Sequence, residues 1–140
     1  NLKIMATLRN PIGWTEIYVE DLSRAQKFYE TVLSMQMQAA PMPAGMDAEP
    51  GSDEYFEMVL FPGDMDAPGS GGALVKSAMF KPGPGGTLNY FSCEDCALEI
   101  SRVAAAGGKV LQEKMSIGEY GFCGICQDTE GNPIGFHSMK

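Results

Sequence analysis

The chain has 140 residues and a mass of 15.1 kDa, which is the size of a single domain. Hydrophobic residues make up 44% and charged residues 20%, a balance that excludes wholesale disorder and allows a packed core. The formal net charge of −8 disfavours nucleic acid and anionic membranes as partners, because both bind basic surfaces. No apolar run approaches the ~20 residues of a membrane helix, and the first residues lack a signal-peptide core. We therefore expect a cytoplasmic protein.

The first half of the sequence predicts one strand, one helix and three further strands. Alternation over 11–19 is typical of a strand, and Asp21 is a favourable N-cap for the helix that follows. Apolar residues at helical spacing place this helix at 22–33. Shorter patterns, separated by loops rich in Gly, Pro and Asp, predict strands at 35–39, 55–61 and 72–78.

The Lys-Pro-Gly-Pro-Gly-Gly segment at 81–86 is interpreted as a linker between two modules, at about 11–80 and 87–140. Residues 1–10 are interpreted as an extension ahead of the domain or a remnant of expression. The second module repeats the order of the first. Its predicted elements are a strand at 88–93, an N-cap at Asp95, a helix at 97–104 ended by Gly107 and Gly108, and strands at 109–113, 121–127 and 134–138.

The two modules can be aligned residue by residue. Val19-Glu20-Asp21 matches Cys93-Glu94-Asp95 at an offset of 74 residues, and the same offset places Trp14 on Leu88. An internal repeat of this kind indicates that the two halves of the chain have the same order of strands and helix. The sequence therefore predicts an α+β fold of two βαβββ modules, whose strands form a curved mixed sheet that encloses a cup.

Four cysteines form two C-x-x-C pairs, Cys93 with Cys96 and Cys123 with Cys126. The 26 residues between the pairs exceed the ~15–20 typical of a zinc ribbon. Positions three apart in a strand also point to opposite faces, which opposes zinc binding by the second pair. We expect four reduced thiols, with a zinc-stapled structural module or a redox dithiol as the alternatives.

Four residues are candidates for a catalytic role. Glu16 shares a strand face with Trp14 and Tyr18, and a carboxylate shielded by aromatic rings can have a raised pKa and act as a general base. The plainer interpretation is a solvated carboxylate. His137, the single histidine, is a candidate second proton carrier or a surface residue at a strand end. Tyr90, like Tyr18, is a candidate hydrogen-bond donor to a developing oxyanion.

Aromatic residues indicate what the cup could bind. Trp14, Tyr18 and Tyr90 suit a planar or cationic organic ligand through stacking and cation–π contacts, although they could equally fill the cup as core. Glu57 is a further candidate, but the alternation of its strand does not fix which face is inward.

An ordered set of segments resembles the vicinal oxygen chelate superfamily, which includes glyoxalase I, bleomycin-resistance proteins and extradiol dioxygenases. The segments are 13–22, 25–30, 89–95, 106–110 and Asp128-Thr-Glu-Gly-Asn-Pro-Ile-Gly135. The resemblance covers the chain from Asn10 onward and is nearest to a branch related to lactoylglutathione lyase. It implies the two-module fold and, because members often form dimers, a homodimer.

Metal-dependent members of this superfamily use four His, Glu or Gln ligands, two from each module. The corresponding positions of this sequence hold Trp14, Leu88 and Gly135, and the strand at 72–78 offers no His, Glu or Asp. Apolar side chains do not hold a divalent ion. The resemblance therefore implies the scaffold without the standard metal centre, with Leu88 and Gly135 lining the ligand site and no cofactor.

We therefore expect a glyoxalase-related protein that binds or transforms a small organic molecule in a concave site. If it is an enzyme, the resemblance implies a lyase or isomerase, and the strand pattern makes Glu16 the candidate base. The alternative is a non-catalytic protein that sequesters a drug or metabolite, because binding needs only a shaped pocket. A zinc-stapled module is the third interpretation.

Overall fold

The computed structural model describes residues 14–40, 48–53, 55–64, 66–78, 80–85, 88–118 and 121–140. The expected N-terminal extension, the last linker residue and the side chain of Trp14 lie outside this part. The described elements, in chain order, are β1 (Trp14–Tyr18), α1 (Leu22–Leu33), β2 (Gln38–Ala40), β3 (Phe56–Leu60), β4 (Gly71–Ser77), β5 (Asn89–Ser92), α2 (Cys96–Val103), β6 (Lys109–Ser116), β7 (Phe122–Gln127) and β8 (Pro133–Ser138).

The strands form two four-stranded sheets with the same internal order, β1-β4-β3-β2 and β5-β8-β7-β6. In each sheet the first strand runs parallel to the fourth, and the remaining pairs are antiparallel. This repeated topology confirms the α+β fold of two βαβββ modules. The sheets are separate in their hydrogen bonding, so the strands do not form one continuous curved sheet, and an enclosing cup stays a prediction.

Both helices begin where the sequence places a capping aspartate. The Asp21 carboxylate accepts a hydrogen bond from the backbone N–H of Arg24 at 3.0 Å, and Asp95 accepts one from Ala97 at 3.0 Å. The two caps lie 74 residues apart, which confirms the offset of the repeat. After α2, Gly107 takes the positive φ of 99° that the predicted helix end requires.

The second strand is shorter and begins later than the predicted 35–39. Helix α1 ends at Leu33, and its C-cap Ser34 takes a left-handed conformation with φ of 53°. The Glu30 carboxylate then accepts a hydrogen bond from the N–H of Met37 at 2.8 Å. Because this side chain and the helix cap hold the backbone through Met37, strand pairing starts only at Gln38.

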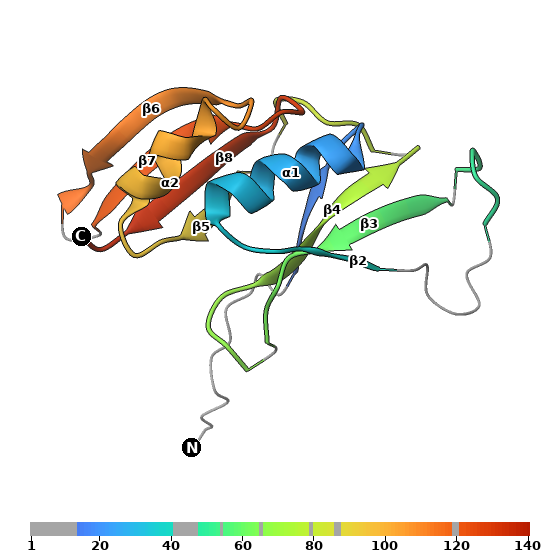
Figure 1. Ribbon diagram of the computed structural model, residues 1–140, viewed down its shortest axis with the longest axis horizontal. Helices are drawn as coiled ribbons and strands as arrows, with labels where there is room; N and C mark the ends of the chain where they lie inside the picture. The colour runs from blue at the N-terminus through green and yellow to red at the C-terminus, as the bar shows by residue number, and fades with distance from the viewer. Residues whose placement is uncertain are drawn as a thin grey trace, which may run out of the picture.

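The two modules share one hydrophobic core on the helix-bearing faces of their sheets. Helix α1 packs on β3 and β4, α2 packs on β6, β7 and β8, and the helices contact each other. Figure 1 shows both helices in front of the strands, with α1 beside α2. Aromatic rings link the modules, since the Tyr29 ring lies 5.8 Å from that of Phe91, which in turn lies 5.7 Å from Phe136. The opposite side of each sheet is called the open face below.

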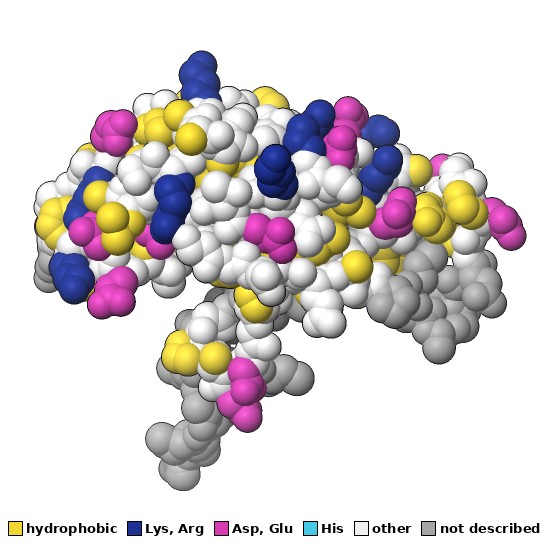
Figure 2. All heavy atoms as spheres, in the orientation of Figure 1, with side chains coloured by type: hydrophobic (Ala, Val, Ile, Leu, Met, Phe, Trp, Pro, Cys, Tyr) yellow, Lys and Arg dark blue, Asp and Glu magenta, His cyan; other side chains and the backbone are white. Residues whose placement is uncertain are grey.

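The helix-bearing surface carries charges of both signs. In Figure 2, Lys and Arg side chains are interspersed with Asp and Glu rather than gathered into one basic patch. Two of the ion pairs on the molecule join Arg24 to Glu130 and Lys114 to Asp95. Within the described residues, no helix has the length and apolar character needed to cross a membrane.

Candidate functional site

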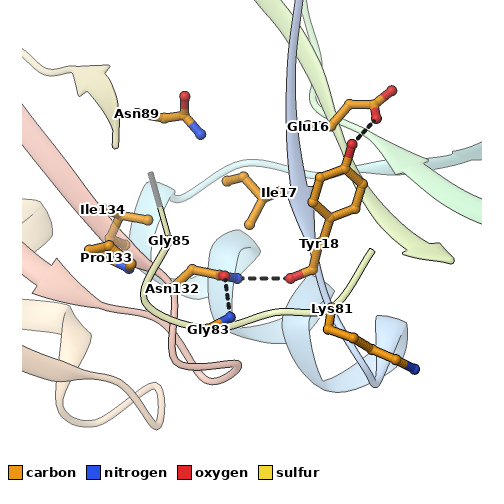
Figure 3. Close-up of a pocket in the computed structure, with 10 residues that line it drawn as sticks. All are labelled: Glu16, Ile17, Tyr18, Lys81, Gly83, Gly85, Asn89, Asn132, Pro133 and Ile134. Atoms are coloured by element: carbon orange, nitrogen blue, oxygen red, sulfur yellow. Dashed lines mark hydrogen bonds between the residues drawn. The ribbon is translucent and has the colours of Figure 1, made fainter. Parts of the chain in front are cut away.

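A cleft of about 120 Å³ lies between the modules, where the edge strand β1 approaches the first residues of β5 and β8. The linker forms its remaining wall through Lys81, Gly83 and Gly85. Figure 3 shows Ile17 and Ile134 facing this space from opposite sides, which gives the cleft an apolar interior. Both isoleucines are at most 4% exposed, so they also belong to the shared core.

The backbone of β1 supplies polar groups to the cleft. The N–H of Val19 donates to the carbonyl oxygen of Val75 at 2.9 Å, so the odd-numbered residues of this parallel edge strand direct their backbone groups toward β4. The backbone groups of Glu16 and Tyr18 therefore point the other way, into the cleft. One of them is paired, because the Asn132 carboxamide donates to the Tyr18 carbonyl oxygen at 2.9 Å.

Two asparagines face this backbone edge. Asn132 fixes the linker as well as β1, since its carboxamide oxygen accepts a hydrogen bond from the N–H of Gly83 at 3.1 Å. Asn89 extends into the cleft from the start of β5 (Figure 3). Within the part of the chain that the structure describes, the Asn89 carboxamide makes no hydrogen bond. It is therefore available to a molecule that enters the cleft.

Glu16 and Tyr18 form a hydrogen-bonded pair on the open face of β1. The Tyr18 hydroxyl donates to a carboxylate oxygen of Glu16 at 2.8 Å, and the Tyr18 ring lies 4.9 Å from the ring of Phe80. Figure 3 shows these two side chains on the opposite side of β1 from Ile17, at the rim of the cleft. Burial and then the hydrogen bond and charge of Glu16 raise the pKa of Tyr18 to about 12. The phenol is thus a protonated donor at neutral pH, and Glu16 accepts its hydrogen bond.

The other predicted site residues lie elsewhere. Tyr90 is 53% exposed, and its ring covers Gly135, so that a Cβ atom at Gly135 would collide with the ring. Leu88 is also exposed. His137 lies three residues beyond Ile134, or about 10 Å along the strand from the cleft. None of these four residues lines the cleft.

Glu57 lies on the helix-bearing side of its sheet. It shares strand parity with Val59, which is buried in the core below α1, and it stands directly opposite Lys76 in register. A second hollow of about 370 Å³, between α1 and β3, includes Glu57 and is otherwise lined mainly by apolar residues. The structure therefore separates Glu57 from the Glu16–Tyr18 pair.

The residues present do not fit the standard metal centre of the superfamily that the sequence resembles. Leu88 and Gly135 carry no donor atom, and the Tyr90 ring occupies the space that a side chain at Gly135 would need. Strand β4 carries only Lys76 and Ser77 as polar side chains. Among the described residues, no three or more His, Cys, Asp and Glu side chains converge to hold a metal ion.

The cysteines do not converge either. Strand β7 is regular, so Cys123 pairs with His137 on the open face while Cys126 pairs with Ile134 on the core face. Cys126 and Cys96 are fully buried. Burial is the main reason why the pKa of Cys93 rises to about 12 and that of Cys126 to about 11, which keeps both thiols protonated. This arrangement disfavours the zinc-stapled module.

Of the residues that line the cleft, the sequence predicted only Glu16 and Tyr18, and it missed the two asparagines, Asn89 and Asn132. Asn132 lies in the segment at 128–135 and Asn89 in the segment at 89–95, both of which resemble the superfamily, but the resemblance gave neither asparagine a role in the site. Asn89 stands next to Tyr90 at a strand start, and nothing in its local pattern distinguishes it from a solvated amide. Both become site residues only because β5 and β8 approach β1.

Comparisons with known proteins agree with this architecture. The family model of the Glyoxalase/Bleomycin resistance protein/Dioxygenase superfamily matches residues 11–136. The "Putative glyoxylase CFP32" of Mycobacterium bovis is 29% identical over 137 residues, which is 94% of this chain and 46% of that protein. The chain therefore spans about half the length of this curated relative.

Solved structures show the same fold. A glyoxalase I mutant from Zea mays matches with a TM-score of 0.66 and 18% identity, over 92% of this chain and 47% of that one. The trypanothione-dependent glyoxalase I of Leishmania major matches with a TM-score of 0.62 and 18% identity, over 94% and 88% of the two chains. At these identities the likeness concerns the fold alone. From the family match, the chain belongs to the Glyoxalase/Bleomycin resistance protein/Dioxygenase superfamily.

Proposed function

We propose that this chain binds a small organic molecule at the cleft between its two modules. The observation that carries the proposal is the Asn89 carboxamide, which makes no hydrogen bond within the described residues and faces the backbone edge of β1 beside the Glu16–Tyr18 pair. A few convergent polar groups around an apolar interior are typical of small-molecule sites. No metal is needed for this binding, since the amide, backbone and carboxylate groups supply the recognition.

The size of the cleft limits what enters it. A volume of about 120 Å³ corresponds to roughly four water molecules at about 30 Å³ each. A compact polar head group fits this space, whereas a whole drug-sized molecule does not. The remainder of a larger ligand would extend over the rim, where the rings of Tyr18 and Phe80 lie against each other.

Charge favours a cationic head group. Glu16 is the acidic residue of the lining, and the whole chain has a net charge of −8. Lys81 also lines the cleft, but Figure 3 shows its side chain directed away from Asn89 and Asn132. A guanidinium or amidinium group would donate to carbonyl and carboxylate oxygens and contact the rim aromatics. This supports the sequestering interpretation of the sequence.

A nuclear magnetic resonance titration of the 15N-labelled chain tests the proposal with methylguanidinium chloride and, as the anionic control, sodium acetate. We expect methylguanidinium, and not acetate, to shift the backbone signals of Tyr18, Asn89 and Asn132. Glu16→Gln should weaken binding about tenfold, because a charge-assisted hydrogen bond is lost. Glu57→Gln removes the same charge from the other face and should bind as the wild type does. Shifts confined to other regions would refute the cleft as the site.

Acid–base catalysis is the second candidate, and the hydrogen bond from Tyr18 to Glu16 favours it because this carboxylate is a positioned proton acceptor. The test is hydrogen–deuterium exchange at the α-carbon of hydroxyacetone in D2O. A catalyst would accelerate exchange above the rate without protein, and Glu16→Gln would abolish the acceleration. Exchange at the uncatalysed rate would rule out this catalysis, and binding would be the function that remains. We also propose that the protein is a homodimer and is located in the cytoplasm, as expected from the sequence. Light scattering measures the oligomeric state.

A further inference from the structure

A row of side chains crosses the open face of the second sheet, at the end of β8 that lies away from the cleft. In register, His137 of β8 stands opposite Cys123 of β7, and Cys123 stands opposite Met115 of β6. Directly opposed residues project from the same face, with Cβ atoms about 4.5–5.5 Å apart. Cys123 is therefore flanked by an imidazole on one side and a thioether on the other.

The neighbours of this row show which face it occupies. Cys126 and Phe136 are fully buried in the core below the helices, and they alternate with Cys123 and His137 along their strands. On β6, Lys114 lies 4.6 Å above the Phe122 ring and bonds to the N-cap of α2, which places it on the helix side. Met115 follows Lys114 and so projects to the open face.

All three members of the row are accessible. Met115 is 42% exposed, and Cys123 and His137 are partly exposed. Cys96 and Cys126 are fully buried, whereas Cys123, like Cys93, is partly exposed. The position of Cys123, opposite the single histidine of the chain, makes it the thiol that is best placed to act as a ligand.

We propose that Met115, Cys123 and His137 bind one Cu(I) ion on the open face of the second sheet. Thiolate and thioether sulfur are soft ligands that select Cu(I), and imidazole nitrogen is compatible with it. Three donors on adjacent strands suit a three-coordinate ion, with the central Cys123 as the anchor. On binding, the Cys123 S–H bond breaks, its proton goes to solvent and an S–Cu bond forms, with no change in the oxidation state of copper.

The thioether distinguishes this site from a zinc site. Zn²⁺ in proteins takes thiolate, imidazole and carboxylate ligands, so Met115 contributes nothing to it. Mg²⁺ and Ca²⁺ prefer oxygen ligands, which the row does not offer. The assignment therefore predicts that loss of the Met115 sulfur weakens Cu(I) binding while leaving any Zn²⁺ binding as it was.

Anaerobic titration of the reduced chain with Cu(I), in competition with bicinchoninate, tests the proposal. We expect one tightly bound Cu(I) per chain in the wild type. Cys123→Ser should weaken binding at least ~100-fold, and His137→Gln and Met115→Leu should each weaken it about 10- to 100-fold, the range typical of perturbed metal sites. Met115→Leu is a volume-conserving change at an exposed position, so it tests the site without endangering the fold.

Two matched controls separate this site from the other sulfur atoms. Met139→Leu removes an exposed thioether outside the row, and Cys93→Ser removes a thiol of the other pair. Both should bind Cu(I) as the wild type does, and circular dichroism verifies the fold of every variant. Unchanged affinity in Cys123→Ser or Met115→Leu, or loss of the ion in Cys93→Ser, would overturn the assignment.

Discussion

The two modules connect their last two strands by very different loops. The loop between β3 and β4 projects from the body of the molecule (Figure 1), and its described residues from Pro62 to Ser70 are exposed. A hydrogen bond within it is local, from the N–H of Asp66 to the Asp64 carboxylate at 2.9 Å. The loop between β7 and β8, at 128–132, instead packs against the first module.

Asp128 is the centre of this second loop. It is 5% exposed, and one carboxylate oxygen accepts the Tyr29 hydroxyl at 2.6 Å and the Asn132 carboxamide at 3.0 Å. The other oxygen accepts the N–H groups of Glu130 and Asn132, both at 2.9 Å. A buried carboxylate with four hydrogen bonds is satisfied, and the bond from Tyr29 joins the loop to α1.

Glu130 makes a second connection between the modules. Its side chain is 0% exposed and accepts two hydrogen bonds from the Arg24 guanidinium, at 2.7 and 2.9 Å. It also accepts the N–H of Glu20 at 3.1 Å, just ahead of α1. A repeat in sequence thus predicts equivalent strands, but of the two equivalent loops it is the one at 128–132 that contacts the other module.

The largest effect on this contact should come from Asp128→Ala. The change leaves the buried Tyr29 hydroxyl and the amide groups of the loop without an acceptor, which should lower the free energy of unfolding by about 3 kcal/mol. Urea denaturation measures this loss. A loss below about 1 kcal/mol would mean that the loop is only a connection between two strands.

A smaller effect is expected for Glu130→Gln. Burial alone would raise the pKa of Glu130, but the hydrogen bonds from Arg24, Thr129 and the Glu20 N–H outweigh it and lower the pKa to about 2. Because Arg24 is half exposed, solvent screening reduces the benefit, and we expect a loss of about 1–2 kcal/mol at pH 7.

The pH dependence of this variant sharpens the test. A carboxylate whose pKa is lowered by folding stabilises the folded state at pH values above its ordinary pKa of 4.5. This stabilisation is lost as the pH falls from 4.5 toward 2. The difference between wild type and Glu130→Gln should therefore shrink over this interval. A difference that stays constant down to pH 2 would contradict the ionic contact.

The smallest effect is expected for Asp64→Ala, which is the matched control in the first module. It removes an exposed carboxylate that accepts a hydrogen bond from Asp66 of its own loop. The free energy of unfolding should change by less than about 0.5 kcal/mol in the same urea experiment. A loss comparable to that of Asp128→Ala would show that the two loops are energetically equivalent after all.

Local patterns were enough to predict most of the fold. Alternation, helical spacing and the capping residues Asp21 and Asp95 act over a few residues, so they located the strands and both helices and revealed the repeat. Strand β2 was misplaced because its start depends on the side chain of Glu30, seven residues earlier. That contact follows from the helix end and not from the strand pattern.

The site was predicted only in part, because it depends on contacts between distant segments. Strand parity correctly placed Glu16 and Tyr18 on one face, where they form a hydrogen bond. The alternation of residues along its strand could not show that Glu57 faces α1. Alternation separates the two faces of a strand, but it does not tell which face the helix covers. Asn132 and Tyr18 are 114 residues apart, and no local pattern relates them.

A crystal structure of the chain soaked with methylguanidinium chloride tests the central claim most directly. We expect density for the planar cation in the cleft between β1 and β5, within hydrogen-bond distance of the Asn89 carboxamide and a backbone oxygen of β1. A saturated crystal with the cation bound only at other surfaces, and with Asn89 unliganded, would contradict it.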